Sequence, residues 1–321
     1  MKFIMRTQHQ NFDQQIIFLR FLAIILILFH HSTTVFDGWP PSDLATLGLN
    51  SHMAMLSSFA KSYGLGIFTF ISGYLIALSG RKKLGLRVVW HKMKKILGPC
   101  IIAAVIYYIW FSDFSYNGDP VNGTHLWYLP MIFILYFLAP FINSSSPMKF
   151  AAGVSAFFVV SFILYRITGI RTFNECTHYI GLFVCGSVFC RVVKHKPNIG
   201  IEKIILVSIV FAITMLKDLK SNISVVIMVS CLYYFLKALK ERKVKRQGIA
   251  WRLSSTIIRQ ISNKSYFIYI VHQFVIDLCI MLIPIDTPYF KTTMIVACFT
   301  LSIIVPLALD YAMNKLKRFI Q

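Results

Sequence analysis

Long apolar runs alternate with short polar segments along the whole of this 321-residue chain. Most runs have about 17–25 residues, the length that an α-helix needs to cross the hydrocarbon core of a bilayer. The pattern predicts about ten membrane-spanning helices, near residues 16–36, 54–79, 94–111, 126–143, 149–168, 178–193, 201–216, 222–239, 264–283 and 291–313. We therefore expect an all-α polytopic membrane protein with a single transmembrane domain over residues 1–321 and no soluble domain.

The composition supports this interpretation. Of the residues, 57% are hydrophobic and only 14% are charged, which excludes an ordinary soluble protein of this length. The first apolar run follows Asp13 and has no small-residue cleavage site behind it, so we expect a retained span rather than a signal peptide. The seven cysteines are scattered without a CxxC pair, so neither a metal site nor a disulfide framework is expected.

Basic residues gather in alternate loops of the predicted bundle. One side collects the lysines and arginines of segments 2–6, 81–95, 191–203, 237–264 and 315–318. The opposite loops, 37–53 and 112–125, contain aspartates but no lysine or arginine. This asymmetry predicts that both termini lie in the cytoplasm. It also accounts for the net charge of +21, so no nucleic-acid partner is expected.

Arg20 and His31 lie in the first predicted span, where such side chains are costly and therefore mark a candidate functional site. They are eleven residues apart, which is three helical turns plus roughly 20°, so they share one face with a rise of roughly 16 Å between them. His30 points roughly 80° away from that face. The structural alternative is that Arg20 reaches the headgroups of one membrane surface and His31 lies at the opposite interface.

Three other segments hold polar side chains that can carry chemistry. His125 and Trp127 open the fourth predicted span, where His125 is a titratable group at the mouth of the bundle and Trp127 can also be an interfacial anchor. His272 lies near the middle of the ninth, either as a functional group or as a hydrogen-bonding partner of another helix. Lys92 and Lys95 belong to a basic run that either sets topology or forms a phosphate-binding rim.

Other small or polar residues in the spans are expected to be structural. Gly64 and Gly73 permit close helix contact in the second span. Asp310 lies near the end of the tenth. Asp277 follows His272 by five residues, about 140° round the helix, so these two do not share a face.

The residues alone allow two classes of function. An enzyme would bring an anionic cytosolic donor to a histidine that acts as a base or acyl carrier. A transporter would use the same histidines as a proton relay. Matched half-helices interrupted by glycine or proline would favour transport, and the two halves of the sequence contain no such pair.

Five segments, in order, resemble motifs of the acyltransferase-3 family of integral-membrane O-acyltransferases. They are Arg20-FLAIILILFHHS, which is similar to an Arg-x10-His signature, Ile67-FTFISGYLI, Lys92-MKKILGP, His125-LWYL and Tyr269-IVH. The resemblance extends over nearly the whole chain. Lysines stand at 92 and 95, where the family usually has arginines.

The resemblance implies transfer of an acetyl group from cytosolic acetyl-CoA to a hydroxyl of a surface glycan or its lipid-linked precursor, such as O-antigen or another exopolysaccharide, at a bacterial inner membrane. Some relatives are associated with polysaccharide export or succinyl transfer, so an exporter with a histidine proton relay is the alternative.

Each candidate residue has an expected role in this reaction. We expect His31 to act as the general base, or as a transient acyl carrier, and Arg20 to pair with donor phosphate or orient the thioester. Lys92 and Lys95 would contact CoA, whereas His125 and Trp127 would line the acceptor mouth. His272 would orient another catalytic group. No metal is expected.

Overall fold

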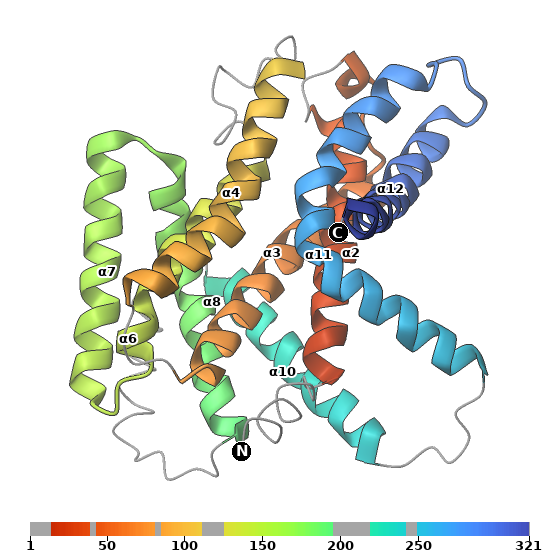
Figure 1. Cartoon of the computed structure of the whole chain (residues 1–321). Coiled ribbons are helices and arrows are strands. Elements are labelled where there is room, and N and C mark those ends of the chain that lie inside the picture. The colour runs from red at the N-terminus through yellow and green to blue at the C-terminus, as the bar shows by residue number, and fades with distance from the viewer. Residues whose placement is uncertain are drawn as a thin grey trace. The chain divides into compact units, whose positions relative to one another are not determined.

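The computed structural model describes residues 14–38, 43–80, 85–110, 125–194, 219–241 and 249–320, and every regular element within them is a helix (Figure 1). The long helices are α2 (Gln14–Thr34), α3 (Ser51–Leu78), α4 (Leu86–Trp110), α7 (Pro147–Thr168), α8 (Arg171–Lys194), α10 (Leu219–Glu241), α11 (Ile249–Leu282) and α12 (Phe290–Ile320). The short ones are η1 (Val35–Asp37), η2 (Asp43–Leu47), η3 (His125–Trp127), α5 (Tyr128–Leu135), η4 (Tyr136–Leu138) and α6 (Ala139–Ile142).

The all-α membrane architecture is confirmed. Among the described residues, seven helical stretches are long and apolar enough to cross a membrane: 14–37, 51–78, 125–142, 147–168, 171–193, 255–282 and 290–316. They correspond to seven of the ten predicted spans. The predicted span 201–216 lies outside the described residues. The total of ten and the cytoplasmic position of both termini stay predictions.

Two predicted spans form helices that differ from the rest. The third is part of α4, which begins earlier than predicted because the basic run at 92–95 is itself helical. The eighth is part of α10, whose apolar stretch, Asn222–Leu236, is shorter than that of the seven long candidates. Sequence hydropathy thus finds the apolar part of a helix, whereas the hydrogen-bonded helix continues into its polar flanks.

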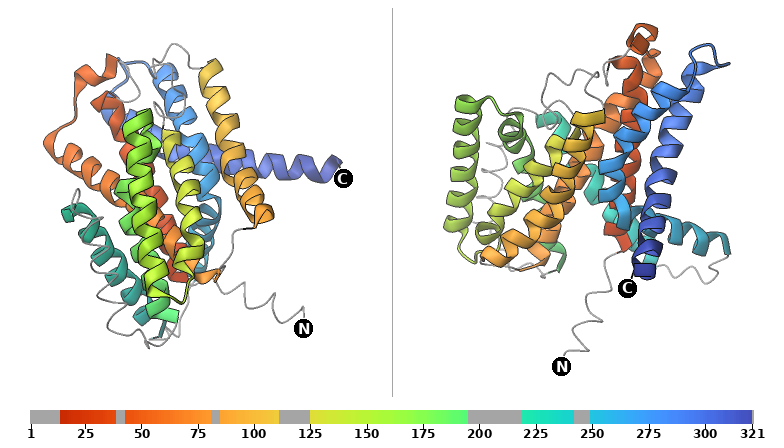
Figure 2. Two further views of the ribbon diagram at one scale, coloured as in Figure 1. Left: turned by 90° about the vertical axis from the view of Figure 1, so that its left-hand side faces the viewer. Right: turned by 45° about the horizontal axis from the view of Figure 1, so that its top comes forward.

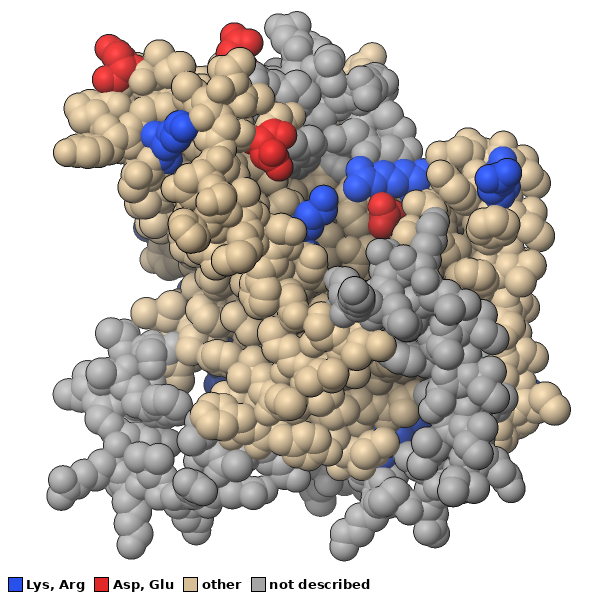
Figure 3. Space-filling view, turned by 180° about the vertical axis from the view of Figure 1, so that it is seen from behind, with Lys and Arg blue, Asp and Glu red and all other residues tan. Residues whose placement is uncertain are grey.

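Exposed apolar side chains indicate which helices face lipid. Ile109 on α4 and Ile167 on α7 are examples of large hydrophobic residues that the protein leaves uncovered. Few charged side chains interrupt the uncharged surface of the described helices on the face shown in Figure 3. Such a surface would be an aggregation hazard in water and is normal in a bilayer, so the exposure agrees with a membrane-spanning bundle.

Local signals in the sequence define helix ends, as α7 illustrates. Pro147 occupies the first turn, where its missing N–H costs nothing, and the Ser146 side chain accepts a hydrogen bond from the Lys149 backbone N–H at 3.3 Å. At the other end Gly169 adopts φ 68°, a left-handed conformation that lets its N–H cap the last turn by bonding the Tyr165 carbonyl at 2.8 Å.

The chain divides into two compact units, residues 1–67 with 228–321, and residues 68–227. The division falls inside α3 and inside α10.

In the first unit α2, α11 and α12 pack against one another, as Figure 1 and the right-hand view of Figure 2 show. Lys264 of α11 donates a hydrogen bond at 2.7 Å to Asp310 of α12. Further along α11, His272 meets Ser302, which precedes Asp310 on α12, so these two helices are antiparallel. At the other end of this pair a buried apolar cluster joins η1, η2, α11 and α12. Its members are Val35, Phe36, Leu44, Val275, Ile276, Cys279, Phe290, Met294 and Cys298.

In the second unit the end of α3 crosses α8 with the two backbones in close contact. A Cβ atom added at Gly73 would collide with the Phe183 carbonyl, and one added at Gly186 would collide with the Phe70 carbonyl. The predicted packing role of Gly73 is therefore confirmed, with Gly186 as its counterpart. In the first unit Gly64 likewise admits Ile27 of α2, whose Cγ1 would lie 2.7 Å from such an added atom.

Candidate functional site

Two histidines meet in the first unit. The imidazole of His31, near the end of α2, lies against that of His272 on α11, with ring centroids 5.0 Å apart. His272 is completely buried, whereas His31 is partly exposed. Two titratable side chains far apart in sequence thus share one place inside an otherwise apolar bundle, which is the arrangement expected of a functional site in a membrane protein.

The backbone of α11 fixes the tautomer of His272. Its Nδ1 lies 2.7 Å from the carbonyl oxygen of Tyr269. Because a carbonyl can only accept, Nδ1 must carry the proton, and the neutral ring then holds its lone pair on Nε2. The Ser302 hydroxyl of α12 donates to the His272 carbonyl at 3.3 Å and ties this turn of α11 to its neighbour. His272 therefore has a defined orientation and an Nε2 that can accept a proton.

Arg20 contacts the same partner helix. Its Nη2 donates to the Ser265 hydroxyl of α11 at 3.3 Å. Arg20 precedes His31 on α2, and Ser265 precedes His272 on α11, so the two helices run in the same direction. The predicted shared face of Arg20 and His31 is thus the face that packs on α11, with a helical rise of about 16 Å between these two backbone positions.

His30 points to a different helix. Its Nδ1 lies 3.0 Å from the Ser57 hydroxyl on α3. The Thr33 hydroxyl is 2.7 Å from the same Ser57 oxygen. The rings of His30 and His31 remain neighbours, with centroids 5.1 Å apart. Consecutive histidines therefore serve two interfaces, as the 100° step between adjacent residues of an α-helix requires.

His125 and Trp127 belong to the second unit, where both are buried. His125 is 2% exposed and packs edge-on against Tyr107 of α4 at 5.8 Å. Trp127 is 7% exposed, and the guanidinium of Arg171 lies 4.8 Å from its ring centroid. The sequence predicts that both side chains line an open mouth, whereas both are covered in this structure. The guanidinium of Arg171 lies over the ring of Trp127 as a cation–π contact.

Lys92 and Lys95 differ in their surroundings. The Lys92 ammonium lies 4.2 Å from the centroid of the Tyr136 ring, a cation–π contact between α4 and η4. Lys95, one turn further, is exposed. The other end of α4 meets His125 through Tyr107, so α4 and the helix that begins at His125 are antiparallel, with Lys92 and His125 at opposite ends of this pair.

The structure therefore places three of the seven predicted site residues, Arg20, His31 and His272, on the α2–α11 interface, where the two histidines are in contact. The other four lie in the second unit. Their roles in donor and acceptor binding stay predictions. In the described residues no group of three or more His, Cys, Asp or Glu side chains is placed to hold a metal ion.

Several polar partners of this site were not assigned a role from the sequence. Ser265 and Ser57 were missed because serine is common in membrane helices as a packing residue. A third feature is the completely buried pair on α11 in which Gln273 Nε2 donates to Asp277 Oδ1 at 2.9 Å. Its signal was available, because two polar residues four apart in an apolar helix are neighbours on one face.

The geometry defines the chemistry that the α2–α11 interface can perform. A neutral imidazole can take a proton from a hydroxyl, and a second imidazole at its edge can accept or stabilise the resulting charge. A guanidinium further along the same face can bind phosphate or carboxylate oxygens. This combination suits acyl transfer.

The comparison with known proteins agrees with this chemistry. No curated protein and no solved structure matches the chain. The acyltransferase domain of the acyltransferase-3 family matches residues 13–311, nearly the whole sequence and all of the helices that carry the site. Together with the apolar helices, this match identifies the chain as a multi-pass membrane acyltransferase that belongs to the acyltransferase-3 family.

Proposed function

We propose that the protein transfers an acetyl group from cytosolic acetyl-CoA to a hydroxyl of a surface glycan or of its lipid-linked precursor, at a bacterial inner membrane. The observation that carries the proposal is the contact between His31 and His272, at 5.0 Å, on the same interface that holds Arg20. An acyltransferase needs a base next to the attacking hydroxyl, and this interface supplies one inside the bundle.

His31 acts as the general base in this proposal. As the sugar oxygen attacks the thioester carbonyl, its O–H proton passes to the imidazole of His31. The C–S bond then breaks, the new C–O ester bond remains, and the proton leaves with the CoA thiolate as a thiol. His272 lies against the ring of His31, and its lone pair on Nε2 makes it the group that orients His31 and stabilises the transient imidazolium.

Arg20 serves the donor. It lies toward the N-terminal, cytoplasmic end of α2 in the predicted topology, about 16 Å from His31 along the helix axis. That separation suits a donor whose anionic part stays near the cytosol while its extended thioester arm reaches the base. Lys92 and Lys95, in a basic run on the predicted cytoplasmic side, are proposed to contact CoA phosphates.

Analysis of the surface glycan in cells tests the proposal. NMR or mass spectrometry should find an acetyl ester in cells that carry the gene and no ester in cells that lack it. Cells that express the His31→Gln variant at the wild-type membrane level should also lack the ester. An intact ester combined with less exported glycan in the gene deletion would contradict the enzyme and favour an exporter that uses the histidines as a proton relay.

A further inference from the structure

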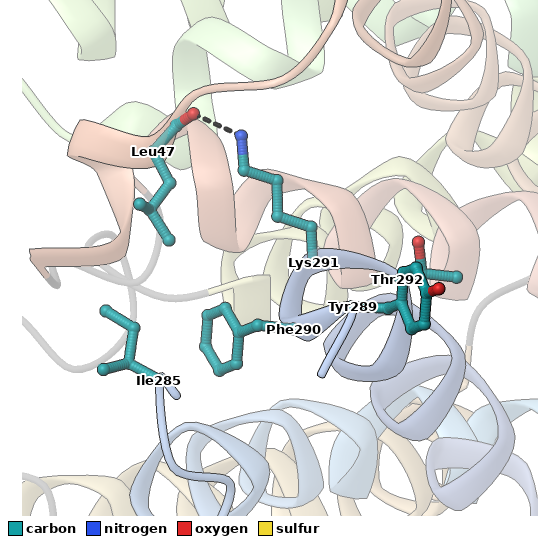
Figure 4. Close-up of a pocket in the computed structure, with 6 residues that line it drawn as sticks. All are labelled: Leu47, Ile285, Tyr289, Phe290, Lys291 and Thr292. Carbon is teal, nitrogen blue, oxygen red and sulfur yellow. Dashed lines mark hydrogen bonds between the residues drawn. The ribbon is translucent and has the colours of Figure 1, made fainter. Parts of the chain in front are cut away.

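A pocket of about 350 Å³ lies at the start of α12 in the first unit. Its lining residues are Leu47, Ile285, Tyr289, Phe290, Lys291 and Thr292, which come from η2, the α11–α12 loop and α12. In Figure 4 Phe290 lies between Ile285 and Lys291, and the Lys291 side chain reaches the Leu47 carbonyl. The volume is at the lower end of the range of about 300–1,000 Å³ typical of small-molecule sites.

The pocket and the histidine pair lie toward the same end of the α2–α11–α12 bundle. Phe290 packs edge-on against Phe36, with ring centroids 6.2 Å apart. Phe36 follows His31 by five residues in the chain. Arg20 is on the other side of His31 along α2. The pocket and the proposed donor end are therefore on opposite sides of the proposed base.

Tyr289 has a conformation that packing does not explain. Its φ is 54°, a left-handed value that is rare for a bulky residue and costs free energy. Its side chain is 89% exposed, so burial gives nothing in return. Strained residues of this kind concentrate where a ligand is held. The ring of Tyr289 offers an uncovered aromatic surface at the edge of the pocket.

The polar groups of the pocket suit hydroxyls. The Lys291 ammonium donates to the carbonyls of Leu47 at 2.6 Å and Gly48 at 3.0 Å, which holds η2 against α12 and still leaves an ammonium with three N–H groups one further donor. Thr292 adds an exposed hydroxyl. The exposed carboxylates of Asp43 and Asp286 belong to the same two segments of chain and add two negative charges to the positive charge of Lys291. A neutral ligand fits this balance better than an anionic lipid headgroup.

We propose that this pocket binds a neutral sugar unit of the glycan acceptor. The Tyr289 ring stacks on the apolar C–H face of the sugar, and Lys291 and Thr292 bond its hydroxyls. Aromatic rings combined with a few convergent polar groups are the usual composition of such sites. This inference rests on the proposed function, because it holds the acceptor at the side of His31 away from Arg20.

The test uses the full chain in lipid nanodiscs. The probe is the repeat-unit oligosaccharide released from the surface glycan of the producing cells and de-esterified with mild base. Saturation-transfer NMR without acetyl-CoA measures binding, and acetyl transfer measures kcat and both KM values. We expect Tyr289→Ala to weaken the saturation-transfer signal and to raise the KM for the oligosaccharide about 10-fold, with kcat and the KM for acetyl-CoA unchanged. Tyr289→Phe should behave as wild type.

Tyr311→Ala is the matched control, because Tyr311 lies on the same helix, is 71% exposed and is far from the pocket. An unchanged KM and signal in Tyr289→Ala would overturn the pocket while the proposed function stood. A lower membrane abundance with unchanged KM would also overturn it and make Tyr289 an interfacial anchor. Binding by wild type without acetyl transfer would overturn the proposed function and leave the pocket. If the wild-type protein neither binds the oligosaccharide nor transfers acetyl to it, both the pocket and the proposed function are overturned.

Discussion

The Nδ1 atom of His30 lies 3.0 Å from the hydroxyl of Ser57, so His30 is turned toward α3 while His31, the next residue, is turned toward His272 on α11. Two adjacent residues of the same type therefore have different expected functions. This difference allows a comparison in which chemistry, helix and membrane depth are all matched.

His31→Gln should lower acetyl transfer by about 10²–10⁴-fold, the usual contribution of a general base. His30→Gln should cost far less, because a glutamine can still bond Ser57 and the proposed base is untouched. Both variants are compared at equal membrane abundance, with acetyl ester on the glycan as the measurement. Equal losses, or a loss only in His30→Gln, would refute His31 as the base.

Reversing the charge of Lys92 and Lys95 on α4 should weaken donor binding, whereas reversing other charges on this helix should not. The double variant Lys92→Glu/Lys95→Glu should raise the apparent KM for acetyl-CoA, because it repels CoA phosphates and removes the cation from the Tyr136 ring. Lys92→Arg should retain activity, since a guanidinium also lies well on an aromatic ring. The control is Arg87→Glu/Lys94→Glu, which changes the same charge on the same helix. If both double variants keep the wild-type KM, these lysines serve only topology.

The crossing of α3 and α8 should not tolerate a side chain. Gly73→Ala or Gly186→Ala should destabilise the protein by about 1–3 kcal/mol, because the added methyl meets a backbone carbonyl on the other helix. Gly98→Ala, on α4, should be neutral or stabilising, since nothing lies within 4 Å of the added atom and alanine favours the helix. Thermal unfolding in detergent measures all three. Wild-type stability of Gly73→Ala would show that the helices can separate there.

Topology gives a further prediction. Reporter fusions after Lys83 and Lys245 should behave as cytoplasmic, and fusions after Asp43, Asp119 and Asp286 as extracytoplasmic, because basic loops stay inside. The ten-span prediction places seven spans between α2 and α11. An odd number of intervening spans makes two helices cross the membrane in the same direction, which agrees with the parallel packing of α2 and α11. An extracytoplasmic signal at Lys245 would contradict the ten-span prediction.

Local periodicity accounts for what the sequence could foresee. The helical repeat correctly separated the face of Arg20 and His31 from that of His30, because a face depends only on the number of residues between two positions. Apolar run length likewise located the seven strongest spans. Both are properties of neighbouring residues.

Packing partners could not be foreseen in the same way. Ser265 is 245 positions from Arg20, and nothing in either span specifies that they meet. The burial of His125 and Trp127 could not be predicted either. The sequence at the start of a span is the same whether these side chains line an opening or are covered by Tyr107 and Arg171. These outcomes depend on which helices are neighbours in three dimensions.

The parallel direction of α2 and α11 has a consequence for biogenesis. Parallel helices cannot enter the membrane as a hairpin, and His272 emerges from the ribosome long after His31. The histidine pair therefore forms only after α11 has been synthesised, and a chain that stops before α11 inserts its first helices without this pair.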